Sequence, residues 1–299
     1  MNGFPLPGSG DAVVAVPAPG AGVGWWAGSS SAALDADGTF VVSYRVRTGE
    51  QGRGSTVVAR SHDGEQFETV AELEQARFGA QSMERPSLVR LESGRWRLYV
   101  CSASPAPSKH WWIDVLEADD PADFGTAEAR TVFPGDERTG VKDPLVQRID
   151  GGWRAWICCH PLDVPDEEDR MTTAYATSAD GLEWEWHGTM LAPRPGTWDA
   201  RGARVTAVLP DGRAAYDGRA TKAENWFERT GLAHHTGEGR LEQVGDDAVA
   251  DVRYLDVLSL PDGGYRIWYE ARLPDESHEL RTELVPRTPV SARPGAPSA

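Results

Sequence analysis

Residues 140–161 read GVKDPLVQRIDGGWRAWICCHP. A lysine, an aspartate and a proline stand directly before an apolar run, which ends at an Asp-Gly-Gly turn and is followed by a second apolar run. Residues 82–103, SMERPSLVRLESGRWRLYVCSA, have the same layout, with a glutamate, an arginine and a proline in the matching places. A hairpin of this kind that occurs twice, with charged residues before its first strand, indicates a chain built from repeats.

The same hairpin pattern occurs five times along the chain. Each copy has an apolar run, a turn carrying Asp or Gly, and a second run rich in Trp, Tyr and Val, which is typical of a β-hairpin. The turn glycines lie 56, 58, 60 and 52 residues apart, so the repeat is close to regular. They are Gly38, Gly94, Gly152, Gly212 and Gly264.

Two further segments predict the remaining strands of the repeated unit. Residues 55–70, STVVARSHDGEQFETV, and residues 172–188, TTAYATSADGLEWEWHG, share a Ser-x-Asp-Gly turn followed by an aromatic residue. We expect each to form a third and a fourth strand joined by that turn. Four antiparallel strands repeated five times describe an all-β, five-bladed β-propeller. A β-sandwich of unrelated hairpins is the alternative, and the regular interval argues against it.

The chain of 299 residues is long enough for one large domain, and propellers of this size form a single one. We expect an extended N-terminal segment over residues 1–23 and the propeller over residues 24–285. The last stretch, residues 286–299, is rich in Pro and Ser, which predicts a flexible tail.

Composition narrows the classes of partner. The net charge of −16 argues against nucleic acid or an anionic membrane, because phosphate binding needs a clustered basic surface. Cys158 and Cys159 lack metal-site spacing, so we expect reduced thiols in a buried strand and neither a metal nor another cofactor. The first residues lack the basic region of a signal peptide, and no run approaches the ~20 apolar residues that span a bilayer. These features predict a cytoplasmic location and leave the oligomeric state open.

The predicted propeller explains why charged residues precede the strands. The first strand of each blade lines the central axis, and the second strand ends at the face where the first begins. Charged groups beside this axis are costly unless they are paired or solvated, so their convergence indicates a site. A lattice of ion pairs that fixes the ring is the alternative. The strand heads supply Glu84, Arg85, Lys142, Asp143, Asp199, Arg201 and Arg253, and the strand ends supply Arg45, His160, Asp217, Arg219 and Glu270.

The Asp143-Pro144 head, the Arg-Pro-Ser-Leu-Val counterpart at Arg85 and the Ser-x-Asp-Gly-aromatic turns resemble the five-bladed propeller glycosidases. This superfamily contains glycoside hydrolase families 32, 43, 62, 68, 117 and 130, and the resemblance covers about residues 24–285. It implies carboxylates at the axial ends of the early blades that act as base or nucleophile, pKa modulator and general acid. Asp143 fits the motif residue for residue. The first blade offers serines where families 32 and 43 have an aspartate, and the second has Glu84 one residue away.

Glycoside cleavage needs two carboxyl groups, one protonated and one ionised. We predict Asp143 as a catalytic residue, with Glu84 and Asp199 as the next choices for acid and base. Trp26 and Trp111 lie near blade junctions, where their flat faces suit a sugar ring, with blade packing as the alternative. The remaining head and end residues are predicted to bind the substrate.

Six cations aimed at one mouth predict that the substrate, a co-substrate or the transition state is negatively charged, because arginine binds oxyanions through two donors. They are Arg45, Arg85, Lys142, Arg201, Arg219 and Arg253. The sequence thus predicts a hydrolase acting on a glycoside or sugar-like small molecule. The alternatives are the same fold with changed chemistry, as a phosphorylase, lyase or biosynthetic cyclase or isomerase, and a non-catalytic carbohydrate-binding propeller.

Overall fold

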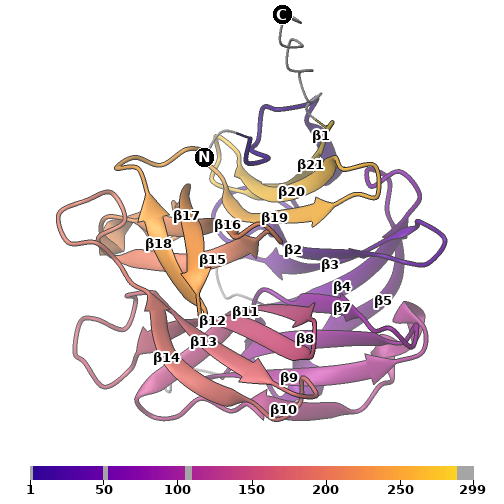
Figure 1. Ribbon diagram of the computed structural model, residues 1–299, viewed down its shortest axis with the longest axis horizontal. Helices are drawn as coiled ribbons and strands as arrows, with labels where there is room; N and C mark the ends of the chain where they lie inside the picture. Colours follow the sequence, from indigo (N-terminus) through magenta and orange to yellow (C-terminus); the bar gives the residue numbers. More distant parts are fainter. Residues whose placement is uncertain (1–2, 50–52, 105–109, 288–299) are drawn as a thin grey trace, which may run out of the picture.

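The structure is a computed structural model that describes residues 3–49, 53–104 and 110–287. Its described part is built almost entirely from antiparallel strands, which follow one another around the molecule in chain order (Figure 1). Short 3-10 turns lie at Gln75–Phe78, Pro121–Gly125 and Lys222–Glu224. No helix among the described residues is long and apolar enough to cross a bilayer.

Three of the sheets are separate units of consecutive strands. The first of these contains β6 (Ser82–Met83), β7 (Ser87–Arg90), β8 (Trp96–Ala103), β9 (Trp111–Ala118) and β10 (Ala129–Phe133). The second contains β11 (Thr139–Ile149), β12 (Gly152–Pro161), β13 (Thr172–Ser178) and β14 (Glu185–Leu191). The third contains β15 (Gly202–Val208), β16 (Arg213–Arg219), β17 (Arg229–Gly237) and β18 (Arg240–Val244).

The remaining sheet has eight strands and divides into two antiparallel halves. The halves are joined by one parallel pairing, between Trp26 of β2 and His278 of β21. One half holds β2 (Trp26–Leu34), β3 (Phe40–Thr48), β4 (Arg53–Ser61) and β5 (Glu68–Glu74). The other holds β19 (Arg253–Ser259), β20 (Tyr265–Arg272), β21 (His278–Val285) and β1 (Val13–Val16).

The hairpins predicted from the repeat are confirmed: β2 pairs with β3, β7 with β8, β11 with β12, β15 with β16, and β19 with β20. The Ser-x-Asp-Gly turns join β4 to β5 and β13 to β14, as expected. At the two turns with adjacent glycines, the left-handed residue is Gly151 or Gly263, at φ 82° and 86°, and so precedes the predicted Gly152 or Gly264. Glycine adopts this conformation without the steric cost of a Cβ.

The N-terminal segment belongs partly to a sheet. β1 pairs antiparallel with the outer side of β21, with Val13 opposite Thr282. The Gly8 and Gly10 N–H groups donate to the Glu283 carboxylate at 2.9–3.0 Å. The predicted extended segment 1–23 therefore contains a strand. Most of the predicted tail lies outside the described residues.

Buried aromatic side chains fix neighbouring sheets to one another. Trp156 of β12 donates its Nε1–H to the Gly239 carbonyl in the next sheet at 2.9 Å. Tyr99 of β8 donates its hydroxyl to the Gly181 carbonyl at 2.9 Å, and is fully buried. Each contact satisfies a polar group while burying a large apolar surface, so the second strand of one unit seats a turn of the next.

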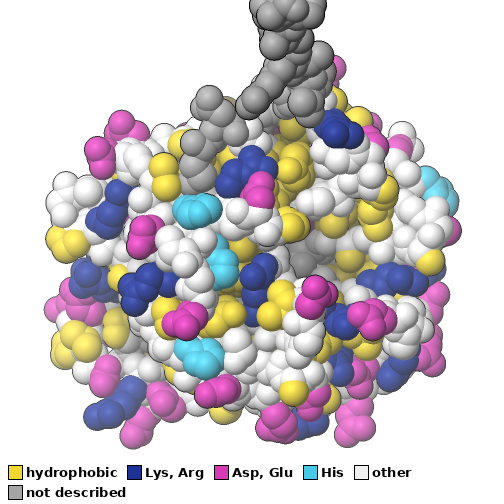
Figure 2. Space-filling model, in the orientation of Figure 1, with side chains coloured by type: hydrophobic (Ala, Val, Ile, Leu, Met, Phe, Trp, Pro, Cys, Tyr) yellow, Lys and Arg dark blue, Asp and Glu magenta, His cyan; other side chains and the backbone are white. Residues whose placement is uncertain are grey.

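The predicted reduced thiols are present as free, buried cysteines, with Cys158 and Cys159 both in β12. On the face shown in Figure 2, acidic and basic side chains are interspersed, and the described residues there form no continuous basic surface.

Candidate active site

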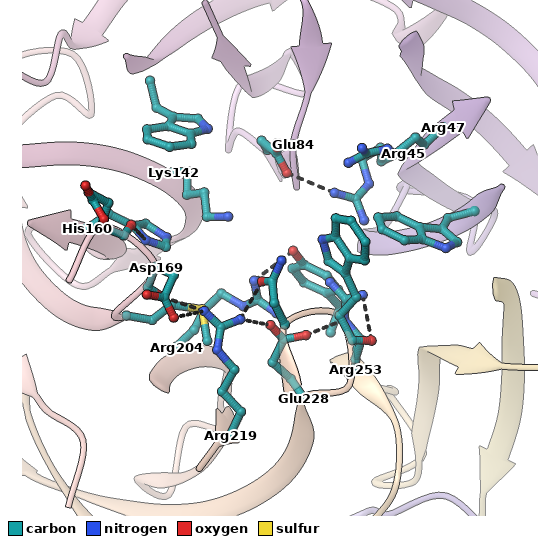
Figure 3. A pocket seen from close by; sticks show the side chains of 17 residues that line it. Arg45, Arg47, Glu84, Lys142, His160, Asp169, Arg204, Arg219, Glu228 and Arg253 are labelled. Carbon is teal, nitrogen blue, oxygen red and sulfur yellow. Dashed lines mark hydrogen bonds and ion pairs between the residues drawn. The ribbon is translucent and has the colours of Figure 1, made fainter. Parts of the chain in front are cut away.

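The axial ends of the strand pairs enclose a cavity of about 240 Å³. Every predicted hairpin contributes to its wall, as Figure 3 shows for the charged residues. Predicted residues that line it are Trp26, Arg45, Glu84, Trp111, Lys142, His160, Arg219 and Arg253. It is also lined by Arg47, Glu168, Asp169, Met171, Arg204, Asn225, Trp226, Glu228 and Tyr254.

Three first strands reach this region through the same backbone irregularity. β2, β11 and β19 each shift register near the head of the strand, at residues 28–31, 142–145 and 253–256. At these points Ser29, Asp143 and Tyr254 take φ values of 56°, 50° and 50°. Non-glycine residues adopt this left-handed conformation at a steric cost, so the surrounding structure must hold them in it. These equivalent bulges indicate that the three strands approach the cavity in the same way.

Arg204 connects the carboxylates and the tyrosine at the base of the cavity. Its Nη1 donates to Asp143 Oδ2 at 2.9 Å and to the Tyr254 hydroxyl at 2.8 Å, and its Nη2 donates to Asp217 Oδ2 at 2.6 Å. The guanidinium carbon lies 3.8 Å from the centre of the Tyr254 ring. Asp143 and Asp217 are buried behind the lining residues and orient them.

Asp143 accepts three further interactions. Tyr254 donates its hydroxyl to Oδ2 at 3.3 Å, the Arg85 N–H donates to Oδ1 at 3.1 Å, and Lys142 Nζ lies 3.9 Å from Oδ2. Burial alone would raise the pKa of Asp143, but the charges of Lys142 and Arg204 outweigh it and hold the pKa well below its usual range. The carboxylate is therefore ionised, and both of its oxygens are engaged.

Glu270 orients lining side chains from behind the cavity wall, as Asp143 does. It lies 3.4 Å from Arg45 and 3.4 Å from Arg253, and His278 Nδ1 lies 2.6 Å from its Oε1. Burial would raise the pKa of Glu270, but Arg253 and His278 hold it well below the usual range. Glu270 thus fixes two arginines that face the cavity.

Glu84 and Glu228 lie on opposite sides of the cavity (Figure 3). Arg45 Nη1 donates to Glu84 Oε2 at 2.9 Å, whereas the Ser82 hydroxyl lies 3.4 Å from Oε1. Glu228 pairs with Arg219 through Oε1, and its Oε2 lies 3.0 Å from Arg253 Nε. Burial would raise the pKa of Glu228, but the surrounding arginine charges lower it to about 2.

One side of the cavity is aromatic. The Trp111 and His160 rings stack with centroids 5.6 Å apart, and Lys142 Nζ lies 5.9 Å from the Trp111 ring centre. His160 Nδ1 is 2.9 Å from the Glu168 carbonyl oxygen, so Nδ1 carries the proton. Burial, reinforced by the Lys142 charge, lowers the pKa of His160 to about 3, and the ring is neutral at pH 7.

Arg85 does not line the cavity, and it contacts a residue in each of the other four strand groups. Its Nε donates to the Ser30 carbonyl at 3.2 Å and its Nη2 to the Thr206 carbonyl at 2.9 Å. Nη2 is also 3.7 Å from Asp256 Oδ1, and the Arg85 N–H binds Asp143. The Arg85 side chain is fully buried. Its contacts therefore fit the lattice of ion pairs that was the alternative to a ligand-binding role.

Asp199 and Arg201 are not among the residues that line the cavity. Asp199 is buried and accepts the Tyr216 hydroxyl at 2.7 Å and Arg194 Nε at 3.1 Å. Arg201 pairs with Glu167 at 2.8 Å and with Asp169 at 2.7 Å. Arg201 therefore fixes the position of the acidic loop from which Glu168 and Asp169 reach the cavity wall.

The strand-head pattern missed several lining residues. Arg204 is the third residue of β15 and reaches the cavity because it stands opposite Asp217 in the β15–β16 ladder. Glu228 directly precedes the third strand of its sheet, where no axial residue was expected. The sequence could have indicated Arg204, because it is an arginine that stands opposite an aspartate on the paired strand. The sequence around Glu228 offers no such indication. Among the described residues, no cluster of His, Cys, Asp and Glu has the arrangement of a metal site.

Comparison with known proteins places the fold. The sequence matches no protein-family model, and no curated protein matches it. Among solved structures, β-1,2-mannobiose phosphorylase from Listeria innocua is 13% identical, with a TM-score of 0.62, over 95% of this chain and 93% of that chain. A thermostable family-43 glycoside hydrolase is 13% identical, with a TM-score of 0.66, over 96% and 100% of the two chains.

Sucrose-6-phosphate hydrolase from Lactobacillus gasseri is 10% identical to this chain, with a TM-score of 0.68. That match covers 93% of this chain and 61% of the other. These likenesses confirm the resemblance at the level of the fold: the chain has the propeller-like fold of glycosidases and related phosphorylases.

Proposed function

We propose that this protein is an enzyme that cleaves a glycosidic bond of a small sugar substrate in the axial cavity. The proposal includes a ring of five blades, obtained by dividing the eight-stranded sheet at its single Trp26–His278 pairing. It takes β1 as the outer strand of the last blade. Each blade then delivers at least one side chain to the cavity.

The observation that carries the proposal is the pair of glutamates facing each other across this cavity (Figure 3). Glycoside cleavage uses two carboxyl groups on either side of the scissile bond. Glu84 is proposed to transfer the proton, because its Oε1 has a single, long contact to Ser82. Glu228 is held ionised by Arg219 and Arg253 and supplies the fixed negative charge. Asp143 acts as a positioning residue through Arg204 and Tyr254.

The size of the cavity bears on the substrate. About 240 Å³ lies below the ~300–1,000 Å³ typical of sites for drug-sized ligands. One sugar ring with its substituents suits such a space better than several units of a polymer. Trp26 and Trp226 add apolar surface to the wall. The proposed substrate is thus a small glycoside or sugar-like molecule, and negative charge on it would complement the cations present.

Phosphorolysis is the second candidate. Six cations line the cavity among the described residues, and one structurally similar protein is a phosphorylase. In that reaction phosphate, rather than water, receives the sugar, and a single proton donor suffices. Glu84 would keep its role, and the cations would hold the phosphate.

The test is product analysis on a panel of disaccharides and aryl glycosides, with and without inorganic phosphate. Cleavage without phosphate supports hydrolysis, whereas phosphate-dependent release of a sugar phosphate supports phosphorolysis. Glu84→Gln is expected to reduce kcat about 100-fold or more, because general acid–base catalysis contributes about 10²–10⁴-fold. Binding of sugars without turnover of any substrate would overturn the proposal in favour of a binding protein.

A further inference from the structure

We infer that the ligand of this cavity is an acidic sugar, and that Lys142 is the specificity-determining residue that binds its carboxylate. The inference rests on the proposed function only in taking the ligand to be a sugar. It concerns what the cavity selects, and is separable from whether a bond is cleaved there.

Four of the arginines that line the cavity are already neutralised by carboxylates. Arg45 lies 3.4 Å from the buried Glu270 and Arg253 lies 3.0 Å from Glu228, and Arg219 also pairs with Glu228. Arg204 is held between two buried aspartates. A planar guanidinium engaged in this way has few donors left for a ligand. These side chains therefore build the wall.

Arg47 has a different environment. Its guanidinium carbon lies 4.7 Å from the Trp26 ring centre and 5.8 Å from that of Trp226. Burial lowers the pKa of this guanidinium, and the two indole rings are its packing partners on this side of the cavity. We assign Arg47 to the support of the aromatic wall.

Lys142 differs from all of these cations. Among the described residues, its nearest carboxylate oxygen is Asp143 Oδ2, at 3.9 Å, which is beyond hydrogen-bond distance. The oxygens of Asp143 already accept hydrogen bonds from Arg204, Tyr254 and a backbone N–H, so Asp143 attracts Lys142 by its charge without taking up its donors. Figure 3 shows the Lys142 side chain projecting into the cavity, with its stem near the aromatic side. Its ammonium group thus presents hydrogen-bond donors to a ligand.

The protonation state of Lys142 fits an anchor better than a base. Burial would lower its pKa, but nearby negative charge, that of Asp143 above all, outweighs burial and raises the pKa above its usual range. A lysine that stays charged attracts an anion and cannot remove a proton from the substrate.

The balance of charge favours a single negative charge over a phosphate dianion. The six lining cations face four lining carboxylates: Glu84, Glu168, Asp169 and Glu228. Three further carboxylates, Asp143, Asp217 and Glu270, are buried directly behind them. The group as a whole has no positive surplus. One ammonium can complement a carboxylate, whereas a phosphate brings a charge of about −1.5 to −2 at pH 7.

The experiment is calorimetric titration of the full-length protein with D-glucuronate and its matched neutral sugar, D-glucose. Inorganic phosphate and glucose 6-phosphate serve as the competing anions. Each is titrated into the wild type, Lys142→Met and Lys222→Met; Lys222 is an exposed lysine in a 3-10 turn and provides the matched control. D-Galacturonate and D-galactose repeat the comparison for a second sugar configuration.

We expect wild type to bind a sugar acid more tightly than its neutral counterpart. Lys142→Met should weaken the sugar acid about 10- to 100-fold, leave the neutral sugar unchanged and preserve Tm, whereas Lys222→Met changes nothing. The inference is overturned if Lys142→Met binds the sugar acid as tightly as wild type, or if phosphate is the preferred ligand. Lys142-dependent binding without turnover would count against the proposed enzyme alone. Turnover of neutral glycosides in preference to their acidic counterparts, with the acidic ones unaffected by Lys142→Met, would count against this inference alone.

Discussion

Asp143, the residue that fits the Asp-Pro motif, is buried behind the residues that line the cavity. Its oxygens hold Arg204, Tyr254 and the Arg85 backbone, and it is 1% exposed. Because its pKa is depressed in the folded state, the ionised carboxylate stabilises the fold above its unfolded pKa of about 4. That contribution is lost as the pH falls through the folded pKa.

We therefore expect Asp143→Asn to lower activity and also stability at pH 7. Weakening a buried charge pair costs up to about 3–5 kcal/mol, and the amide keeps some of the hydrogen bonds. The difference in unfolding free energy between wild type and variant should be constant from pH 7 to 5 and shrink below about pH 4. Urea denaturation at a series of pH values measures it. A difference that does not change with pH would show that the charge of Asp143 is not what stabilises the fold.

At the scale of single residues, strand-head reasoning located Lys142 and Arg253 at the bulges of β11 and β19, and Glu84 in the break between β6 and β7. It could not separate a cation that is neutralised from one that is available. That distinction depends on partners such as Glu228, which comes from a connection before β17. The path of such connections is not contained in the period of the strands.

At the scale of elements, the hairpins were predictable because each turn needs a glycine and has an apolar run on either side. How one sheet seats on the next depends instead on single close contacts. Gly239, in the β17–β18 turn, has φ 78° and lies against the Tyr175 ring, where an added Cβ would overlap ring atoms. Gly188 has φ 83° and no atom within 4 Å of the same position.

These two glycines allow a matched test of the packing between sheets. Gly188→Ala is expected to cost about 1–2 kcal/mol, the price of a left-handed alanine. Gly239→Ala carries the same backbone cost and must also displace Tyr175, so its loss of unfolding free energy should be clearly larger. Chemical denaturation of both variants gives the comparison. Equal losses would mean that the turn moves freely and does not fix the neighbouring sheet.

At the scale of the whole molecule, the ring is tied together at its edge and at its axis. At the edge, β1 adds to β21, and β21 meets β2 through one pairing, so the first and last parts of the chain share a sheet. At the axis, one arginine from the loop between β6 and β7 reaches the other units. Neither tie follows from a single repeat, because each links segments far apart in the sequence.

Arg85→Met is the sharpest test of the axial tie. The substitution keeps a long, partly apolar side chain but leaves the Ser30 and Thr206 carbonyls without their donor and Asp256 without its cation. Removing one member of a buried charge pair costs about 3–5 kcal/mol. Arg201→Met provides the control: this arginine is likewise ion-paired, to two carboxylates where Arg85 has one, but it is partly exposed, where ion pairs contribute about 0–1 kcal/mol.

We expect Arg85→Met to lower Tm by several degrees more than Arg201→Met, with one cooperative transition in both. Because Asp256 has a pKa raised by burial to about 6, losing the nearby cation should raise it further and let the carboxyl group stay protonated at pH 7. The deficit of Arg85→Met should then be smaller at pH 5 than at pH 8, because protonation removes the unpaired charge. Calorimetric melting at the two pH values measures this difference. If Arg85→Met retains wild-type Tm but loses sugar binding, Arg85 serves the ligand and the ring holds together without it.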